Sequence, residues 1–262
     1  MKTDKEYLQK ALEFVETNEL RKYVDALLDY WEVEPISSLG HGFGHVLEVA
    51  VEAYEIAKLN NYNNPKLLFL AGLYHDVNRP AKGEDGSEEH HWQSYREVEK
   101  ILEKLGAPEN FLENLKVAIS DDWKTEEKPP EFAQILFVAD KSVLHSRMAD
   151  AYAWASNEYA RKNGKDIPYP TPLHTMQGYI KYMNKLWDLV LKIDLVGKEH
   201  VIFNFVDIVN HCQRMYLYDP EGKNYQNYLD TVADMYRDKE TKYLEAFGRS
   251  KESIKKIIHK KS

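Results

Sequence analysis

The chain has 262 residues, of which 43% are hydrophobic and 30% charged, and its formal net charge is −8 at pH 7. This acidic balance argues against a protein that binds duplex nucleic acid, because such binding depends on a basic surface that neutralises phosphates. It is compatible with a small phosphorylated ligand. The single cysteine, Cys212, excludes an intramolecular disulfide and a zinc finger, so a metal site would have to use histidine and carboxylate ligands.

No stretch of the sequence has the length of a membrane span. The strongest apolar run, residues 67–74, is too short to cross a bilayer, and the N-terminus leads into a charged helical pattern instead of a signal sequence. We therefore expect a cytoplasmic protein with no membrane association.

Apolar residues recur at helical spacing along nearly the whole chain, and no alternating run of useful length predicts a strand. The sequence therefore predicts an all-α protein. Pro65, Pro108 and Pro172 favour the first turn of a helix, where a missing N–H costs little. The predicted helices span residues 4–17, 20–31, 43–60, 65–76, 88–105, 108–121, 131–160, 173–193, 199–218 and 225–247, with a lysine-rich last helix over 250–262.

A polar segment with two prolines, residues 161–170, interrupts the helical pattern. We expect a boundary here between a helical domain, 1–165, with its core at about 40–150, and a C-terminal helical extension, 166–262, packed on it. The extension would cover the site, build a dimer surface or select the ligand. Its aromatic residues are expected to pack between helices; they include Tyr179, Tyr182, Trp187, Phe203, Phe205, Tyr216, Tyr225 and Tyr228.

An aspartate lies on the apolar stripe of the helix predicted over 131–160. Asp140 comes four residues after Leu136 and three before Val143, which both face the core. An isolated buried carboxylate is costly. Asp140 must therefore be protonated, paired with a lysine or arginine, or bound to a metal ion.

Two histidines and a second aspartate also lie on, or directly after, apolar stretches that are predicted to be helical. His45 lies at the N-terminal end of the inward face of the helix over 43–60. His75 and Asp76 follow an apolar run and project about 100° apart on a helix, so both can reach one ion beyond its last turn. With Asp140 they supply two imidazoles and two carboxylates. This set suits manganese, iron, cobalt, nickel or zinc, and it also admits magnesium, with positions left open for water or substrate.

The order and helical context of these residues resemble the H…HD…D pattern of the HD-domain superfamily of metal-dependent phosphohydrolases. The resemblance covers about residues 40–150. It implies the α-helical HD bundle, in which His45, His75, Asp76 and Asp140 would be the ligands of a divalent transition metal ion.

The resemblance also implies further site residues. Arg79 lies where relatives often place a catalytic or phosphate-contacting side chain, and a guanidinium can hold two phosphate oxygens at once. Lys141 is a weaker candidate of the same kind. His90 or His91 matches a histidine that would bind a second metal ion or act as an acid or base. The alternative is that these are ordinary surface charges and a histidine at a helix start.

The stretch of residues 118–123 departs from the members that bind two metal ions, which often carry a further histidine here. Asp122 lies four residues after Ala118 and would replace that ligand, with Asp121 as the alternative. Otherwise both aspartates simply end the helix predicted over 108–121.

We therefore expect a phosphomonoesterase or phosphodiesterase that uses a metal-activated water to hydrolyse a nucleotide or another small phosphorylated metabolite. Asp76 or Asp122 would orient or deprotonate the water, and Arg79 or His90 would assist. One alternative is a mixed-valent di-iron oxygenase of the same superfamily, for which a site richer in histidine is expected. The other is a regulatory protein that binds a metal ion or nucleotide without turnover.

Overall fold

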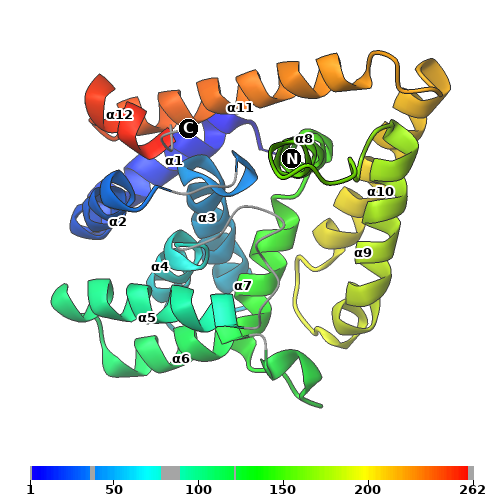
Figure 1. Cartoon of the computed structure of the whole chain (residues 1–262). Helices are drawn as coiled ribbons and strands as arrows, with labels where there is room; N and C mark the ends of the chain where they lie inside the picture. The colour runs from blue at the N-terminus through cyan, green and yellow to red at the C-terminus, as the bar shows by residue number, and fades with distance from the viewer. Residues whose placement is uncertain (1, 36–38, 78–88, 121, 259–262) are drawn as a thin grey trace.

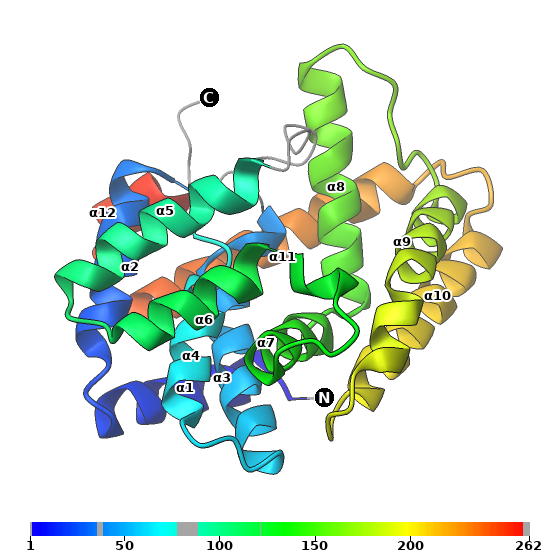
Figure 2. The same ribbon diagram turned by 90° about the horizontal axis from the view of Figure 1, so that it is seen from below.

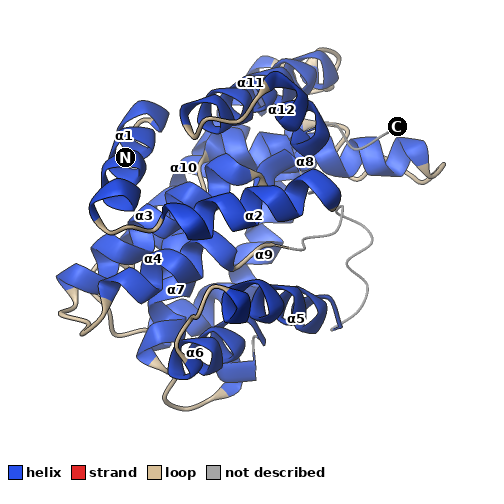
Figure 3. Cartoon of the chain, turned by 90° about the vertical axis from the view of Figure 1, so that its left-hand side faces the viewer, coloured by secondary structure: helices blue, strands red, loops and turns tan. Residues whose placement is uncertain are grey.

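The computed structural model describes residues 2–35, 39–77, 89–120 and 122–258, apart from the side chains of residues 89–93 and 122. No strand occurs among these residues (Figure 3), which confirms the all-α prediction. Within the same ranges no helix combines the length and apolar composition needed to cross a membrane. The helices are α1 (Asp4–Thr17), α2 (Arg21–Val33), η1 (Leu39–His41), α3 (Phe43–Leu59), α4 (Pro65–Tyr74), α5 (Glu89–Lys104), α6 (Glu109–Ser120), η2 (Asp122–Thr125), α7 (Glu131–Ser142), α8 (Ser146–Lys162), α9 (Pro172–Lys192), α10 (Glu199–Tyr218), α11 (Tyr225–Ala246) and α12 (Lys251–Ile258).

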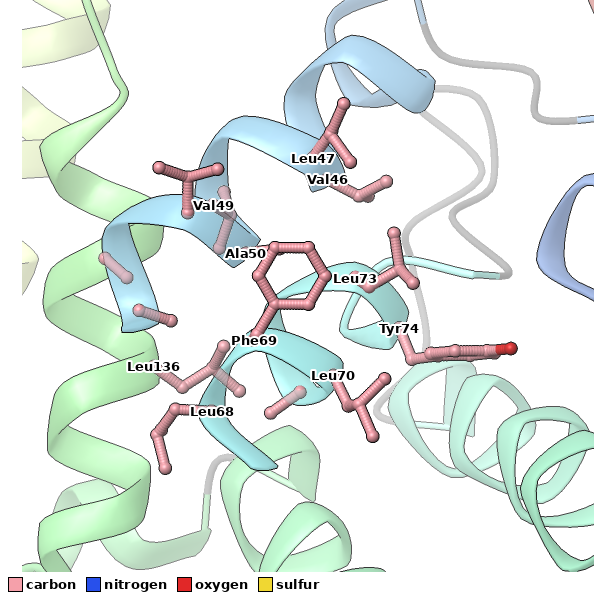
Figure 4. Packing of buried hydrophobic residues seen from close by; sticks show 14 of the residues in the cluster. Val46, Leu47, Val49, Ala50, Leu68, Phe69, Leu70, Leu73, Tyr74 and Leu136 are labelled. Atoms are coloured by element: carbon pink, nitrogen blue, oxygen red, sulfur yellow. The ribbon is translucent and has the colours of Figure 1, made fainter. Parts of the chain in front are cut away.

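Helix α3 lies at the centre of the molecule (Figure 1). From Phe43 to Ala53 each of its residues is buried, as expected for a helix that other helices cover on all sides. Helices α1, α4 and α7 pack directly on it. Figure 4 shows how aliphatic and aromatic side chains of α3, α4 and α7 fill the space between them.

Helices α3 and α4 approach each other most closely at Gly72. A Cβ atom at this position would lie 2.5 Å from the Cα atom of Ala50 and 2.6 Å from its backbone nitrogen. Only glycine permits this contact, because backbone atoms cannot move aside as a side chain can. The contact places the last turn of α4 against the middle of α3, at Val49 and Ala50.

Helix α4 is shorter than the predicted 65–76, because it ends at Tyr74 with His75 as its C-cap. The Nδ1–H group of His75 donates to the carbonyl oxygen of Gly72 at 2.7 Å. In a continuing helix that oxygen would accept the backbone N–H of Asp76. The imidazole therefore takes the place of a backbone donor at the helix end.

The prediction of one helix over 131–160 is wrong, since the structure has two, α7 and α8, separated by residues 143–145. The side-chain amide of Asn204, on α10, donates to the carbonyl oxygen of Ser142 at 2.6 Å. Ser146 N–H would use that oxygen in a continuous helix. No glycine or proline lies between 131 and 160, so no such local residue marks the break, and the partner of the Ser142 carbonyl oxygen lies 62 positions away. The other predicted helices agree within two residues at each described end.

The part of the chain after residue 165 packs back on the first part. Helix α11 crosses the molecule and α12 reaches α2, while α9 and α10 lie side by side at one edge (Figures 1 and 2). One hydrophobic cluster contains residues from Tyr7 to Ile257, so both parts contribute to it. The division into 1–165 and 166–262 stays a prediction.

Two adjacent residues of α11 attach this helix to α3. The carboxylate of Glu240 accepts the backbone N–H of Gly44 at 3.0 Å, in the first turn of α3, where Gly42 provides no side-chain cap. The ammonium group of Lys239 lies 2.6 Å from the buried carboxylate of Glu48. The C-terminal extension therefore caps the central helix.

Replacing Gly72 with alanine is expected to lower the free energy of unfolding by about 1–3 kcal/mol, because the added methyl group meets the backbone of α3. Urea denaturation of the full chain measures this change. Gly178→Ala is the control, since Gly178 is also helical but its added methyl group would meet the movable ring end of Tyr169. Unchanged or greater stability of Gly72→Ala would contradict the close approach.

Burial raises the pKa of Glu240 to about 7, against the lowering effects of Lys239 and the Gly44 N–H and with a raising effect of Glu48. Between the ordinary value of 4.5 and about 7, the folded protein holds a proton that the unfolded chain releases, so the free energy of unfolding falls as pH rises through this window. The Glu240→Gln variant keeps an acceptor for the Gly44 N–H but has no carboxyl proton to release. Its free energy of unfolding should therefore fall less than that of the wild type as pH rises from 4.5 to about 7.

Urea titrations over this pH window compare the Glu240→Gln variant with the wild type, and the exposed Glu245→Gln variant serves as the control. Parallel pH profiles of the wild type and Glu240→Gln would refute the prediction.

Candidate metal centre

Four side chains selected from the sequence meet near the start of α3. His45 comes from the first turn of α3, His75 and Asp76 follow α4, and Asp140 lies on α7. The Nε2 atom of His75 lies 3.3 Å from Oδ2 of Asp76 and 3.8 Å from Oδ1 of Asp140. The Nε2 atom of His45 lies 3.6 Å and 3.4 Å from the same two oxygens. Such separations suit ligands that share one ion at about 2.0–2.2 Å.

Both imidazoles present a ring nitrogen that has no hydrogen-bond partner among the described residues. These atoms are Nε2 of His45 and Nε2 of His75, and both are buried. The bond from His75 Nδ1–H to Gly72 leaves Nε2 as the ring nitrogen that faces the cluster, where it would offer a lone pair to a metal ion once its proton is released. Ligand atoms of His45, His75 and Asp76 all lie within 4.8 Å of one another. A divalent transition metal ion fits this set of nitrogen and oxygen donors and would satisfy the unpartnered nitrogens.

The two carboxylates give the region between the four side chains a negative electrostatic potential. Burial alone would lower the pKa of His75, but the charges of Asp76 and Asp140 outweigh it and raise that pKa to about 10. Burial alone would raise the pKa of Asp140, whereas Lys141 and the two histidines hold it well below its ordinary value. Positive charge, as a proton or as a metal ion, is therefore favoured between these side chains.

Lys141 holds the second oxygen of Asp140. Its Nζ atom lies 2.5 Å from Oδ2, while Oδ1 is the oxygen nearest His45 and His75. Of the alternatives predicted for Asp140 from the sequence, the structure contains the pairing with a lysine, while binding to a metal ion stays a prediction. The ammonium group also lies 5.7 Å from the ring centre of Tyr182 on α9, so the C-terminal extension reaches this place.

A further titratable side chain, His41 of η1, borders the cluster. Its Nε2 atom lies 3.9 Å from Oδ2 of Asp76 and 3.1 Å from the hydroxyl of Tyr152 on α8, whose ring stacks on the imidazole. The pattern that selects the other four residues omits His41, because it precedes the predicted helix and lies on no apolar stripe. Its position four residues before His45 is the sequence signal that indicates it.

The further site residues expected from the sequence stay predictions. Arg79 and Asp121 lie outside the described residues. His90 and His91 lie in α5 and Asp122 in η2, but their side chains are outside the described part of the chain. The second metal ion is therefore untested.

Comparison with known proteins gives one match. Residues 42–143 match the model of the HD domain, and this segment contains His45, His75, Asp76 and Asp140. Neither the curated proteins nor the solved structures include a match. HD domains define a superfamily of metal-dependent phosphohydrolases. The chain therefore carries an HD domain, which confirms its resemblance to the HD-domain superfamily.

Proposed function

We propose that this protein is a metal-dependent hydrolase of phosphate esters, with a nucleotide or another small phosphorylated metabolite as its substrate. One observation carries the proposal: the unpartnered Nε2 atoms of His45 and His75 face carboxylate oxygens of Asp76 and Asp140 inside an HD domain. Two imidazoles and two carboxylates resemble an open catalytic site more than the cysteine-rich set of a closed structural zinc site.

The proposed metal ligands are His45, His75, Asp76 and Asp140. A bound divalent ion would supply a more acidic water and a positive charge that offsets the charge on phosphoryl oxygens. The mixed donors suit manganese, iron, cobalt, nickel or zinc. His90, His91 and Asp122 are the proposed ligands of a second ion.

The side chains around this set have separate proposed roles. The carboxylate of Asp76 would orient the attacking water or accept its proton. His41 lies next to that carboxylate, where its Nε2 can exchange the proton. Arg79 would hold phosphate oxygens in a two-pronged contact, and His90 would act as acid or base.

Removing one proposed ligand is expected to remove most of the bound metal. His45→Gln, Asp76→Ala and Asp140→Asn should each reduce metal affinity and phosphate release by more than about 100-fold, the upper end of the cost of losing an outer-shell partner. Elemental analysis measures the metal. A phosphate-release panel of nucleotides and other small phosphate esters, with added manganese or cobalt, measures activity.

The controls for these variants are His174→Gln and Asp234→Asn, which change exposed residues far from the cluster. Unaltered metal content in the three ligand variants would refute the assignment. Substrate loss that depends on oxygen, together with a visible absorption band, would favour the di-iron oxygenase instead. Thermal stabilisation by nucleotides without any turnover would favour the binding protein.

Replacing Lys141 with methionine is expected to weaken metal binding by about 10–100-fold, because Asp140 loses the partner that fixes its carboxylate. Metal titration of the variant measures the affinity, and saturating metal should restore most of the activity. Lys242→Met, at an exposed position on α11, is the control. If Lys141 instead contacts the substrate phosphate, metal affinity will stay unchanged and KM will rise.

A further inference from the structure

The outer faces of α9 and α10 carry large apolar side chains that no described residue covers. Six of them are between 41% and 74% exposed. Eight aromatic residues of the extension are expected from the sequence to pack between helices, and this expectation is wrong for two of them, Trp187 and Phe203. We call this surface the α9–α10 face; it consists of Ile180, Trp187, Leu191, Phe203, Val206 and Leu217, with Asn184 and Asn210 among them.

On each helix, exposed apolar residues and one exposed asparagine follow the spacing of a coiled-coil seam. On α9 they are Ile180, Asn184, Trp187 and Leu191, at steps of four, three and four residues. On α10 they are Phe203, Val206, Asn210 and Leu217, at steps of three, four and seven. Away from these positions, α10 already packs against α7 and α8, and α9 packs against α10 and α8. Each helix is therefore buried on one side and carries a second apolar seam on its exposed side. Such a second seam indicates that further helices pack against it.

The two seams border a shallow groove between α9 and α10. Its lining is apolar except for Asn184 and Asn210. A single polar residue within an apolar seam sets the register and the number of helices that associate. One such residue lies on each helix, so the face has the means to select a defined partner arrangement.

We propose that the α9–α10 face is the contact of a homodimer, in which the helix pairs of two copies form a four-helix bundle. Helices of 21 and 20 residues are each about 30 Å long. Two such helices with axes about 8–10 Å apart present a face of roughly 30 Å by 20 Å, or about 600 Å². This approaches the roughly 800 Å² per partner that standard protein interfaces bury.

The charges on the two helices select the orientation of the copies. A two-fold axis along the helices places α9 opposite the α10 of the other copy, whereas an axis across them places α9 opposite α9. Lysines predominate on α9 and acidic residues on α10, so the first arrangement brings unlike charges together. The charged residues are Lys181, Lys185, Asp188 and Lys192 on α9, and Glu199, Asp207 and Arg214 on α10.

Dimerisation through this face would also stabilise the side chains at the candidate metal centre. Tyr182 of α9 lies against Lys141, which in turn holds Asp140. Ordering of α9 by a second copy would therefore stabilise the side chains beside the proposed ligands. The dimer itself is independent of the proposed hydrolysis, because it rests on other residues.

Sedimentation velocity of the full chain over a range of concentrations tests the proposal, with a dimer as the expected species. Trp187→Glu and Phe203→Glu should each raise the dissociation constant at least about tenfold while the circular dichroism spectrum stays that of the wild type. Leu191→Glu and Leu59→Glu form a matched pair, since both leucines are 59% exposed; the first variant should dissociate and the second should not.

Three outcomes would overturn the proposal. The first is that the wild-type chain stays monomeric at every concentration. The second is that the Trp187→Glu/Phe203→Glu double variant still dimerises. The third is that the chain is a monomer that cosediments with phosphatidylcholine vesicles, and that the same substitutions abolish this binding. Lys181→Gln/Lys185→Gln tests the orientation. It should weaken a dimer in which α9 faces α10, whereas tighter association would show that α9 faces α9 and would overturn the proposed axis.

Discussion

The close approach of α3 and α4 at Gly72 is the constraint on which the candidate site depends. The missing side chain lets the backbone of α4 lie against Ala50, and the carbonyl oxygen of the same residue accepts the Nδ1–H group of His75. One residue therefore brings the two helices together and orients an imidazole at the end of the contact. His45, near the start of α3, meets that imidazole because the helices are fixed at this distance.

Electrostatics supplies the second constraint. Asp76 and Asp140 place two carboxylates in a buried region, and buried negative charge requires compensation. Lys141 compensates one oxygen of Asp140, and the raised pKa of His75 shows that the remaining charge favours a proton on that imidazole. A metal ion would have to displace this proton, so metal binding and proton release are coupled at the site.

The C-terminal extension takes part in both constraints. Glu240 caps the first turn of α3, the turn that carries His45, and Tyr182 packs against Lys141. Residues after position 165 therefore support the geometry of the HD domain, and one of them, Glu240, lies 196 positions from its contact on the central helix. The exposed outer seams of α9 and α10 extend this reasoning to a second copy of the chain, because a helix pair that supports the site is itself covered on one side only.

The helical class, most helix bounds and four converging site residues could be predicted from the sequence. Apolar spacing is a local property, and a histidine or aspartate on an apolar stripe is a local anomaly that is visible without the fold. The break between α7 and α8, the Glu240 cap and the place of His41 beside Asp76 could not be predicted, because each requires a contact between residues far apart in the chain. Apolar residues around α9 and α10 are likewise visible in the sequence, but only the packing of α7 and α8 decides which seam is buried and which remains exposed.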